Sequence, residues 1–193
     1  MSVLLKLIFL LGLLAVSPLL LFAMVIVFFE DGSPVIFSQK RLGKNKKLID
    51  IYKIRTMQKS TPNKGTHEIN NSSYLRVGFF LRNFKIDELP QIINFLKGEI
   101  NIVGPRPCLP NQYDLINHRE KYNIYDINPG ITGLSQILGY DMSNPEVLAK
   151  VDGLYLKKKS FKLDLQIFLA TFLSFFKKKI KIDLINELDK IKN

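Results

Sequence analysis

The sequence is poor in the residues that build disulfides and zinc sites. It has one cysteine, Cys108, so no disulfide can form within the chain, which is typical of proteins from reducing compartments. Its two histidines, His67 and His118, lie far apart, which argues against a histidine-based zinc site. We therefore expect any bound metal ion to have oxygen ligands.

Acidic residues are also scarce relative to basic ones. The 193 residues include 28 lysines and arginines against 17 aspartates and glutamates, a formal net charge of +11. Such an excess indicates an anionic partner, which can be nucleic acid, an acidic membrane surface or a phosphorylated substrate. Most arginines lie between positions 41 and 106. Because a guanidinium group binds phosphate or carboxylate through two hydrogen bonds, this block is a candidate anion site.

Residues 7–29 form an apolar run that is long enough to cross a bilayer as a straight helix. Ser17 and Pro18 lie at its middle, where proline removes a backbone hydrogen bond and kinks a helix. Basic residues flank the run on both sides, so both ends favour the cytoplasm. A helix that breaks at Ser17 and Pro18 and returns to the same membrane face fits this charge pattern. From hydropathy alone, a kinked spanning helix is an equal alternative, whereas a cleaved signal peptide fits less well.

The segment 86–107 places two adjacent carboxylates, Asp87 and Glu88, at the start of a short helix. It then returns through an apolar strand to an arginine, Arg106, between two prolines. With Asp87 as the N-cap, its side chain faces the first free amides of that helix, which Gly98 then ends. These amides favour an ionised carboxylate and also attract phosphate. The pattern suits an anionic nucleophile beside an anionic substrate, although an isolated Asp-Glu pair is more often only a helix cap.

Further elements are expected around this segment. We predict strands at 35–37 and 48–54 and helices at 74–84, 111–125 and 145–159. The glycine-bearing turn at 129–133 either brings backbone amides to an anion or only reverses the chain.

The C-terminal apolar stretch 163–176 is bracketed by lysine clusters. It is too short to span a membrane comfortably, and lysines at both ends suit a helix in the plane of the lipid headgroups. A buried core helix with solvated lysines at its ends is a nearly equal alternative.

Six blocks in order resemble the motifs of the bacterial sugar transferase family, the small monotopic phosphoglycosyl transferases. The blocks are 37–43 (FSQKRLG), 52–57 (YKIRTM), 81–82 (LR), 87–91 (DELPQ), 104–107 (GPRP) and 129–133 (PGITG). The resemblance covers roughly residues 5–176, and six ordered blocks are specific where each alone is weak.

The resemblance implies an α+β fold in three parts. The first, residues 1–31, is a re-entrant membrane hairpin of the helix-break-helix type. The second, 32–160, is a cytoplasmic catalytic domain with a small β-hairpin and short helices. The third, 161–193, is an amphipathic helix at the membrane interface with a basic tail. The chain is then expected to be the minimal form of the family, the catalytic unit alone.

The resemblance also implies a reaction, the first membrane step of glycan assembly. A sugar 1-phosphate passes from a UDP-sugar to undecaprenyl phosphate at the cytoplasmic face of the bacterial inner membrane, with Mg²⁺ as cofactor. Asp87 would be the nucleophile that expels UMP and forms an aspartyl-phosphosugar, and Glu88 would act as base or metal ligand, both carboxylates holding Mg²⁺. A covalent intermediate lets the soluble donor and the lipid acceptor react in turn. The metal screens the repulsion between carboxylate and diphosphate.

The substrate contacts carried over from the family are basic, proline and turn residues. They are Lys53, Arg55, Arg76, Arg82, Pro105, Arg106, Pro107, Gly130 and Thr132. Departures from the family pattern occur at Lys85, where serine or threonine is frequent, and at Asn128, where arginine is frequent. The helix cap must then come from elsewhere than position 85.

Two other functions fit parts of the sequence. A membrane-anchored basic module that binds acidic lipid or nucleic acid without catalysis would explain the charge. It needs no Asp-Glu pair followed by Gly-Pro-Arg-Pro, so with the family reaction no nucleic acid is expected as partner. A metal-dependent phosphohydrolase would use Asp87 in the same way but would release free phosphosugar.

Overall fold

The computed structural model describes residues 3–62 and 71–192. The chain divides into two compact units, Met1–Gln39 with Asp50–Gly98 and Lys40–Ile49 with Glu99–Asn193. This division is based on contacts within the protein. The three parts expected from the sequence are defined by their relation to the membrane instead, and that division stays a prediction.

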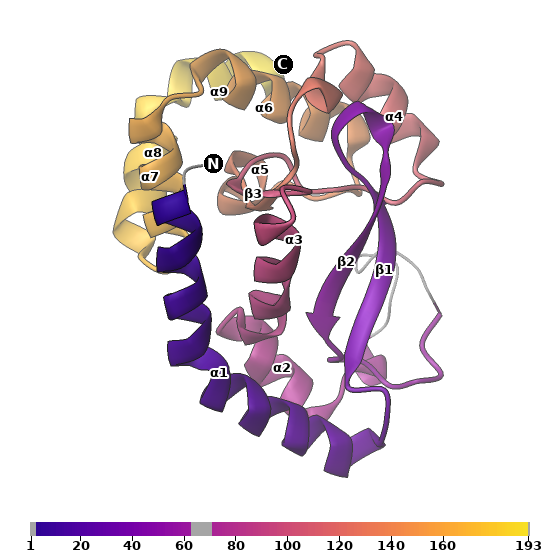
Figure 1. Cartoon of the computed structure of the whole chain (residues 1–193). Helices are drawn as coiled ribbons and strands as arrows, with labels where there is room; N and C mark the ends of the chain where they lie inside the picture. The colour runs from indigo at the N-terminus through magenta and orange to yellow at the C-terminus, as the bar shows by residue number, and fades with distance from the viewer. Residues whose placement is uncertain (1–2, 63–70, 193) are drawn as a thin grey trace. The chain divides into compact units, whose positions relative to one another are not determined.

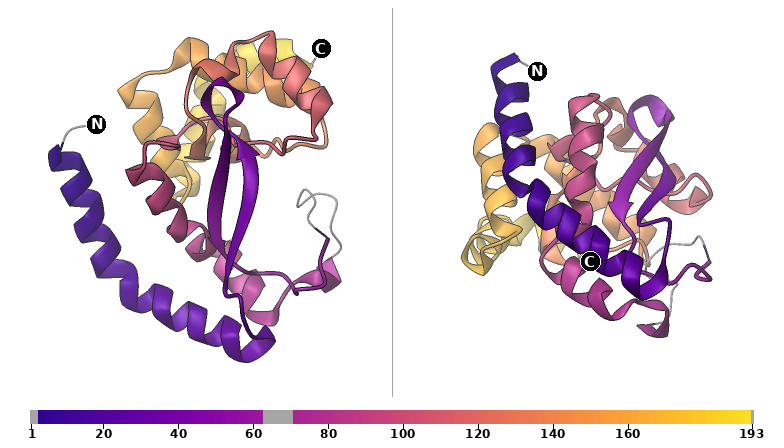
Figure 2. Two further views of the ribbon diagram at one scale, coloured as in Figure 1. Left: turned by 45° about the vertical axis from the view of Figure 1, so that its right-hand side comes forward. Right: turned by 60° about the horizontal axis from the view of Figure 1, so that its bottom comes forward.

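The first unit begins with a long apolar helix, α1 (Val3–Asp31) (Figure 1). The chain remains helical through Ser17 and Pro18, and Figures 1 and 2 show α1 bent along its length. A bend is the expected result of a proline inside a helix. The predicted kink is therefore present, but helical structure is not interrupted, and a return to the same membrane face stays a prediction.

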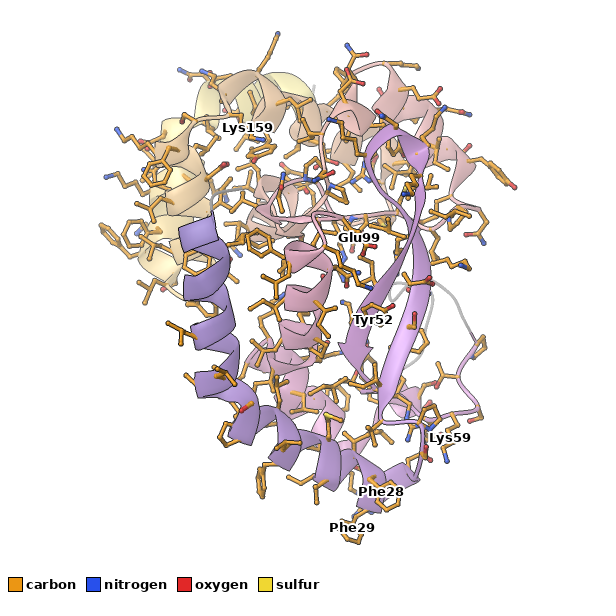
Figure 3. All side chains as sticks on the ribbon, in the orientation of Figure 1. Phe28, Phe29, Tyr52, Lys59, Glu99 and Lys159 are labelled. Atoms are coloured by element: carbon orange, nitrogen blue, oxygen red, sulfur yellow. The ribbon has the colours of Figure 1, made fainter. Side chains whose placement is uncertain are left out.

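The second half of α1 is mostly uncovered by the described protein. Its segment Leu14–Asp31 has a mean hydropathy of 2.0 and is long and apolar enough to cross a membrane, yet only 17% of it is buried. Phe28 and Phe29, at the end of α1, are exposed and point away from the ribbon (Figure 3). This part of α1 is thus available for contact with lipid.

One stripe of α1 anchors the helix to the rest of the first unit. Leu20, Ala23, Met24 and Val27 are spaced so that they share a helix face. They belong to an apolar cluster with residues from later parts of the first unit, which include Ile54, Leu75, Leu81 and Ile86. The anchored stripe and the exposed faces together make α1 a helix held on one side only.

A β-hairpin, β1 (Ile36–Leu42) and β2 (Leu48–Ile54), follows α1. The predicted bounds of β2 are confirmed, whereas β1 extends beyond the predicted 35–37. The connection contains a single turn of 3-10 helix, η1 (Lys44–Lys46).

Short helices complete the first unit. They are η3 (Asn71–Ser73), α2 (Arg76–Asn83), η4 (Ile86–Gln91) and α3 (Ile92–Leu96). The predicted helix 74–84 corresponds to α2, which is slightly shorter.

The second unit contains a two-stranded parallel sheet that the sequence only half predicted. β3 (Asn101–Val103) is the apolar strand expected after Gly98, and β4 (Gly130–Thr132) lies in the segment read as a turn. Asn101 pairs with Gly130 and Val103 with Thr132. Because the pairing partner lies far along the chain, periodicity could not reveal it.

The second unit also contains the helices that follow β3 in the chain. They are α4 (Tyr113–Glu120), η5 (Ile124–Asp126), α5 (Leu134–Leu138), α6 (Pro145–Lys158), α7 (Phe161–Ala170), α8 (Ser174–Asp183) and α9 (Ile185–Lys192). The prediction of α6 is confirmed to within one residue, and Asn144 caps it by accepting a hydrogen bond from the Val147 amide at 3.2 Å. The predicted helix 111–125 is wrong in length, since α4 ends at Glu120.

The C-terminal stretch expected as one helix is divided between α7 and α8. Leu163, Ile167 and Ala170 of α7 are buried in the core of the unit, whereas Phe161 and Phe168 are exposed. One face of α7 is thus a core face, as the alternative interpretation held. Contact between the exposed face of α7 and lipid headgroups stays a prediction.

Candidate active site

Asp87 and Glu88 lie in the first turn of η4, the 3-10 helix that leads into α3. The prediction that Asp87 is the N-cap is wrong. The N-cap is Lys85, in a left-handed conformation with φ 59°, and no side chain caps the helix. The chain leaves α2 through a backbone turn, in which the Lys85 amide donates to the Arg82 carbonyl at 3.1 Å, and the Lys85 carbonyl then accepts the Glu88 amide at 3.2 Å. Gly98 ends the helical segment with φ 76°, as predicted.

Glu88 is paired with a lysine from the neighbouring hairpin. The Nζ atom of Lys53, on β2, lies 2.8 Å from Glu88 Oε1, and Lys85 Nζ lies 3.9 Å from Glu88 Oε2. Glu88 is buried and Lys53 is half-buried, so water screens this pair less than a surface pair. The structure thus brings Lys53, a substrate contact implied by the resemblance, next to the acidic pair.

Asp87 is buried beside this pair and has one oxygen, Oδ1, without a hydrogen-bond partner among the described residues. Burial raises its pKa above the ordinary value of 3.8, and the neighbouring Glu88 adds to the rise, while Lys53 lowers it. Sequence reasoning expected the helix start to favour the ionised form, and burial outweighs that effect here. A buried carboxylate with an unbonded oxygen is a group that an external cation would stabilise.

The two carboxylates fit a magnesium ion that is shared with a substrate. Mg²⁺ prefers oxygen ligands and usually binds through one or two carboxylates together with substrate phosphates. In the described part of the chain, no group of three or more histidine, cysteine, aspartate or glutamate residues is arranged to hold a metal ion. The unbonded Oδ1 of Asp87 next to Glu88 is consistent with such a shared site.

Arg82 is held close to the acidic pair within the first unit. Its Nε atom donates to Thr56 Oγ1 at 2.8 Å, and its Nη1 atom donates to the Tyr74 hydroxyl at 2.9 Å. Its positive charge also acts on Asp87 by lowering the pKa of that carboxyl. Arg76 differs, because its side chain is exposed at the start of α2, whose first amides bind the Glu30 carboxylate.

The guanidinium group of Arg55 binds to other residues of the protein. Its Nη2 atom donates to the carbonyls of Gly32 at 2.7 Å and Asp31 at 3.0 Å, and its Nη1 atom donates to the Pro34 carbonyl. An ion pair of 3.2 Å to the Asp31 carboxylate adds to these bonds. The side chain joins the end of α1 to β2, which favours a structural role over the predicted substrate contact.

In the second unit, backbone hydrogen bonds join the turn that carries Arg106 to the Pro-Gly-Ile-Thr-Gly segment. The Gly104 amide donates to the Thr132 carbonyl, and the Gly130 amide donates to the Pro105 carbonyl, both at 2.9 Å. A Cβ atom on Gly130 would lie 2.1 Å from the Gly104 nitrogen, so only glycine fits. Gly130 and Thr132, predicted as substrate contacts, thus support the Arg106 turn through their backbones.

Donors also bind the carbonyls of the turn. Arg119 Nη1 donates to the Arg106 carbonyl at 2.8 Å, and Arg41 Nη1 donates to the Pro107 carbonyl at 3.2 Å. Burial and the neighbouring Arg106 guanidinium lower the pKa of Arg41 to about 10. Two half-buried guanidinium groups that repel each other would be stabilised by a bound anion.

Sequence reasoning missed Arg119 and its buried partner, Asp152. A signal was present, because Arg119 follows Leu115 and Asp152 follows Leu148 at a spacing of four, which places each charge on the apolar face of its helix. Two opposite charges at core positions of neighbouring helices indicate a buried pair.

The class of the protein follows from comparison with known sequences. Residues 3–178 match the family described as bacterial sugar transferase, and the chain belongs to this family. It is therefore an enzyme of a transferase family, as the resemblance predicted, and a binding module without catalysis is not favoured.

Individual relatives of the chain carry sugar transferase or sugar phosphotransferase names. The chain is 37% identical over 155 residues to "Uncharacterized sugar transferase EpsL" of Bacillus subtilis, which covers 80% of this chain and 76% of the relative. It is 34% identical over 162 residues to a UDP-N-acetylgalactosamine-undecaprenyl-phosphate N-acetylgalactosaminephosphotransferase of Aeromonas hydrophila (80% of this chain, 38% of the relative). It is 35% identical over 182 residues to a UDP-glucose:undecaprenyl-phosphate glucose-1-phosphate transferase of Klebsiella pneumoniae (86% and 38%). The chain thus spans most of the first relative and less than half of the other two.

Proposed function

We propose that this protein transfers a sugar 1-phosphate from a UDP-sugar to undecaprenyl phosphate through a covalent aspartyl-phosphosugar on Asp87. The observation that carries the proposal is the state of that side chain. Asp87 is buried, has an unbonded oxygen, and lies beside a Glu88 carboxylate that is already neutralised by Lys53. A structural carboxylate in this setting would normally have both oxygens bonded.

The reaction proceeds in two displacements. An oxygen of Asp87 attacks the phosphorus that bears the sugar, the bond from this phosphorus to the bridging oxygen breaks, and UMP leaves with that oxygen. A phosphate oxygen of undecaprenyl phosphate then attacks the same phosphorus and releases Asp87 as a carboxylate. The lipid product carries the sugar on a diphosphate. Nucleophilic catalysis of this kind divides one difficult transfer between two substrates into two easier steps.

The neighbouring residues have separate roles. When bound, Mg²⁺ neutralises charge on the diphosphate and the carboxylates. Lys53 fixes Glu88 by the 2.8 Å ion pair, and Arg82 adds positive charge near Asp87. Arg106, between Pro105 and Pro107, is assigned to the donor diphosphate. Arg76, exposed at the start of α2, remains a candidate contact.

The proposed location is the cytoplasmic face of the bacterial inner membrane, with α1 as a monotopic anchor that enters and leaves the same leaflet. The mostly uncovered apolar segment of α1 and its bend support this arrangement. A donor that is water-soluble and an acceptor that is a membrane lipid both reach a site held at the membrane surface.

The test is incubation of the purified enzyme with Mg²⁺ and a panel of sugar-labelled UDP-sugars, without lipid acceptor. We expect release of about one UMP per enzyme and label bound to the protein, and Asp87→Asn should give neither while keeping its circular dichroism. Adding undecaprenyl phosphate should move the label into lipid. UMP release that occurs only with the lipid present would exclude the covalent step, and catalytic release of free phosphosugar would indicate a hydrolase.

A further inference from the structure

The second unit contains a buried charge pair that has no place in the proposed chemistry. Arg119 on α4 and Asp152 on α6 are both 1% exposed. Two nitrogens of the guanidinium group, Nε and Nη2, donate to Asp152 Oδ2 at 3.0 and 2.6 Å. Ser135 on α5 donates to the other oxygen, Oδ1, at 2.9 Å. Three helices thus fix the orientation of one guanidinium group.

Stability alone is a weak explanation for this arrangement. Burying two charges carries a large desolvation penalty, and apolar side chains of similar volume often serve the fold as well. What the pair gives, and apolar packing cannot, is a hydrogen-bond donor in a defined position. That donor is Nη1 of Arg119, which bonds to the Arg106 carbonyl at 2.8 Å.

The bond to this carbonyl fixes the peptide plane that follows Arg106. Pro107 already restricts the conformation of Arg106, and the Pro105 carbonyl is held by the Gly130 amide at 2.9 Å. Beyond the turn, the Cys108 carbonyl accepts from the Leu42 amide at 2.9 Å. Together with these neighbouring restraints, the bond from Arg119 fixes the backbone from which the Arg106 side chain leaves.

We propose that Arg119 is a positioning residue, which acts through the Arg106 carbonyl to hold the Arg106 guanidinium ready for the diphosphate of a nucleotide donor. The proposal rests on the function proposed above, in which Arg106 binds that diphosphate. A preorganised side chain loses less conformational freedom on binding, so the bond improves affinity for the donor. Arg119 itself touches no substrate.

The experiment measures the affinity of the full-length protein for UDP in the presence of Mg²⁺, which needs no turnover and no knowledge of the sugar. Arg119→Met combined with Asp152→Asn removes both charges and leaves an acceptor for Ser135. We expect this variant to bind UDP at least about tenfold more weakly. Arg119→Lys keeps the charge but is a compact ammonium group that does not reach both Asp152 and the carbonyl, so it should also bind less well.

Two further variants separate positioning from general destabilisation. Asn144→Ala removes the cap of α6, the helix that carries Asp152, and should lower the melting temperature without weakening UDP binding. In an Arg106→Ala background, the Arg119 and Asp152 substitutions should cause no additional loss of UDP affinity, since the side chain that they position is absent.

Three results would overturn the proposal. Wild-type affinity in the charge-free variant or in Arg119→Lys would show that the carbonyl bond does not affect binding. A full additional loss in the Arg106→Ala background would show that Arg119 acts on the fold in general. If Arg106→Ala itself binds UDP normally, the assignment of Arg106 in the proposed function fails as well, and the two failures are thereby distinguished.

Discussion

The hydroxyl of Ser17 donates a hydrogen bond to the carbonyl of Leu14 at 2.8 Å. In a regular helix this carbonyl would accept the amide of residue 18, which proline lacks. The serine therefore bonds to the carbonyl that its neighbour leaves free. This explains how α1 remains helical through a proline at its centre, in a segment where apolar surroundings make an unbonded carbonyl costly.

Replacement of both Ser17 and Pro18 by alanine should straighten α1. If the bend returns the chain to the same membrane face, the straight helix should place the N-terminus on the opposite side. Accessibility of an N-terminal tag to an impermeant reagent in oriented vesicles measures this change. Gly12→Ala is the control, because a Cβ atom there meets no atom within 4 Å. A tag on the same side in both proteins would contradict the hairpin.

Asp87→Asn should make the folded protein more stable at neutral pH. It should also lower the rate of transfer by roughly a thousandfold or more. Because burial raises the pKa of Asp87 in the folded state, the native protein holds this proton more tightly than the unfolded chain. Native stability therefore falls as pH rises through the folded-state pKa. Asparagine does not titrate, so the gain in melting temperature should be near zero below pH 3.8 and grow with rising pH. A gain that is independent of pH would show that ionisation of Asp87 does not oppose folding.

Lys53→Met should lower kcat/KM by roughly ten- to a hundredfold, since it removes the nearer of the two lysines that pair with the buried Glu88 carboxylate. The acid limb of the pH profile of kcat/KM should also move to higher pH, because loss of a positive charge raises the pKa of Asp87 further. Lys47→Met, at an exposed position in the connection between β1 and β2, is the control. Equal effects of the two substitutions would indicate a general loss of positive charge.

Arg55→Met should act on stability more than on substrate binding. The change removes the donors for the carbonyls of Asp31 and Gly32, and we expect the free energy of unfolding to fall by about 2 to 4 kcal/mol. KM for the UDP-sugar should change less than in Arg106→Ala. Thermal unfolding and initial rates on the folded fraction measure the two effects. A large rise in KM without loss of stability would restore Arg55 as a substrate contact.

The sequence predicted the elements whose signals are local. The composition of 48–54 predicted β2, Pro145 marked the start of α6, and Gly98 marked the end of a helical segment. It did not predict the pairing of strands that lie far apart along the chain. β4 consists of three residues that carry no alternation, and it forms a strand only because β3 lies beside it.

The family and the acidic pair at 87 and 88 are evident from the sequence, because both depend on residues that are adjacent or in a fixed order along the chain. The groups that surround this pair are known only from the tertiary structure. The ion pair of Lys53 with Glu88 joins residues 35 positions apart, and that of Arg119 with Asp152 joins residues 33 apart. Such partners are chosen by burial and by the packing of separate elements, and burial in turn gives Asp87 its raised pKa and unbonded oxygen.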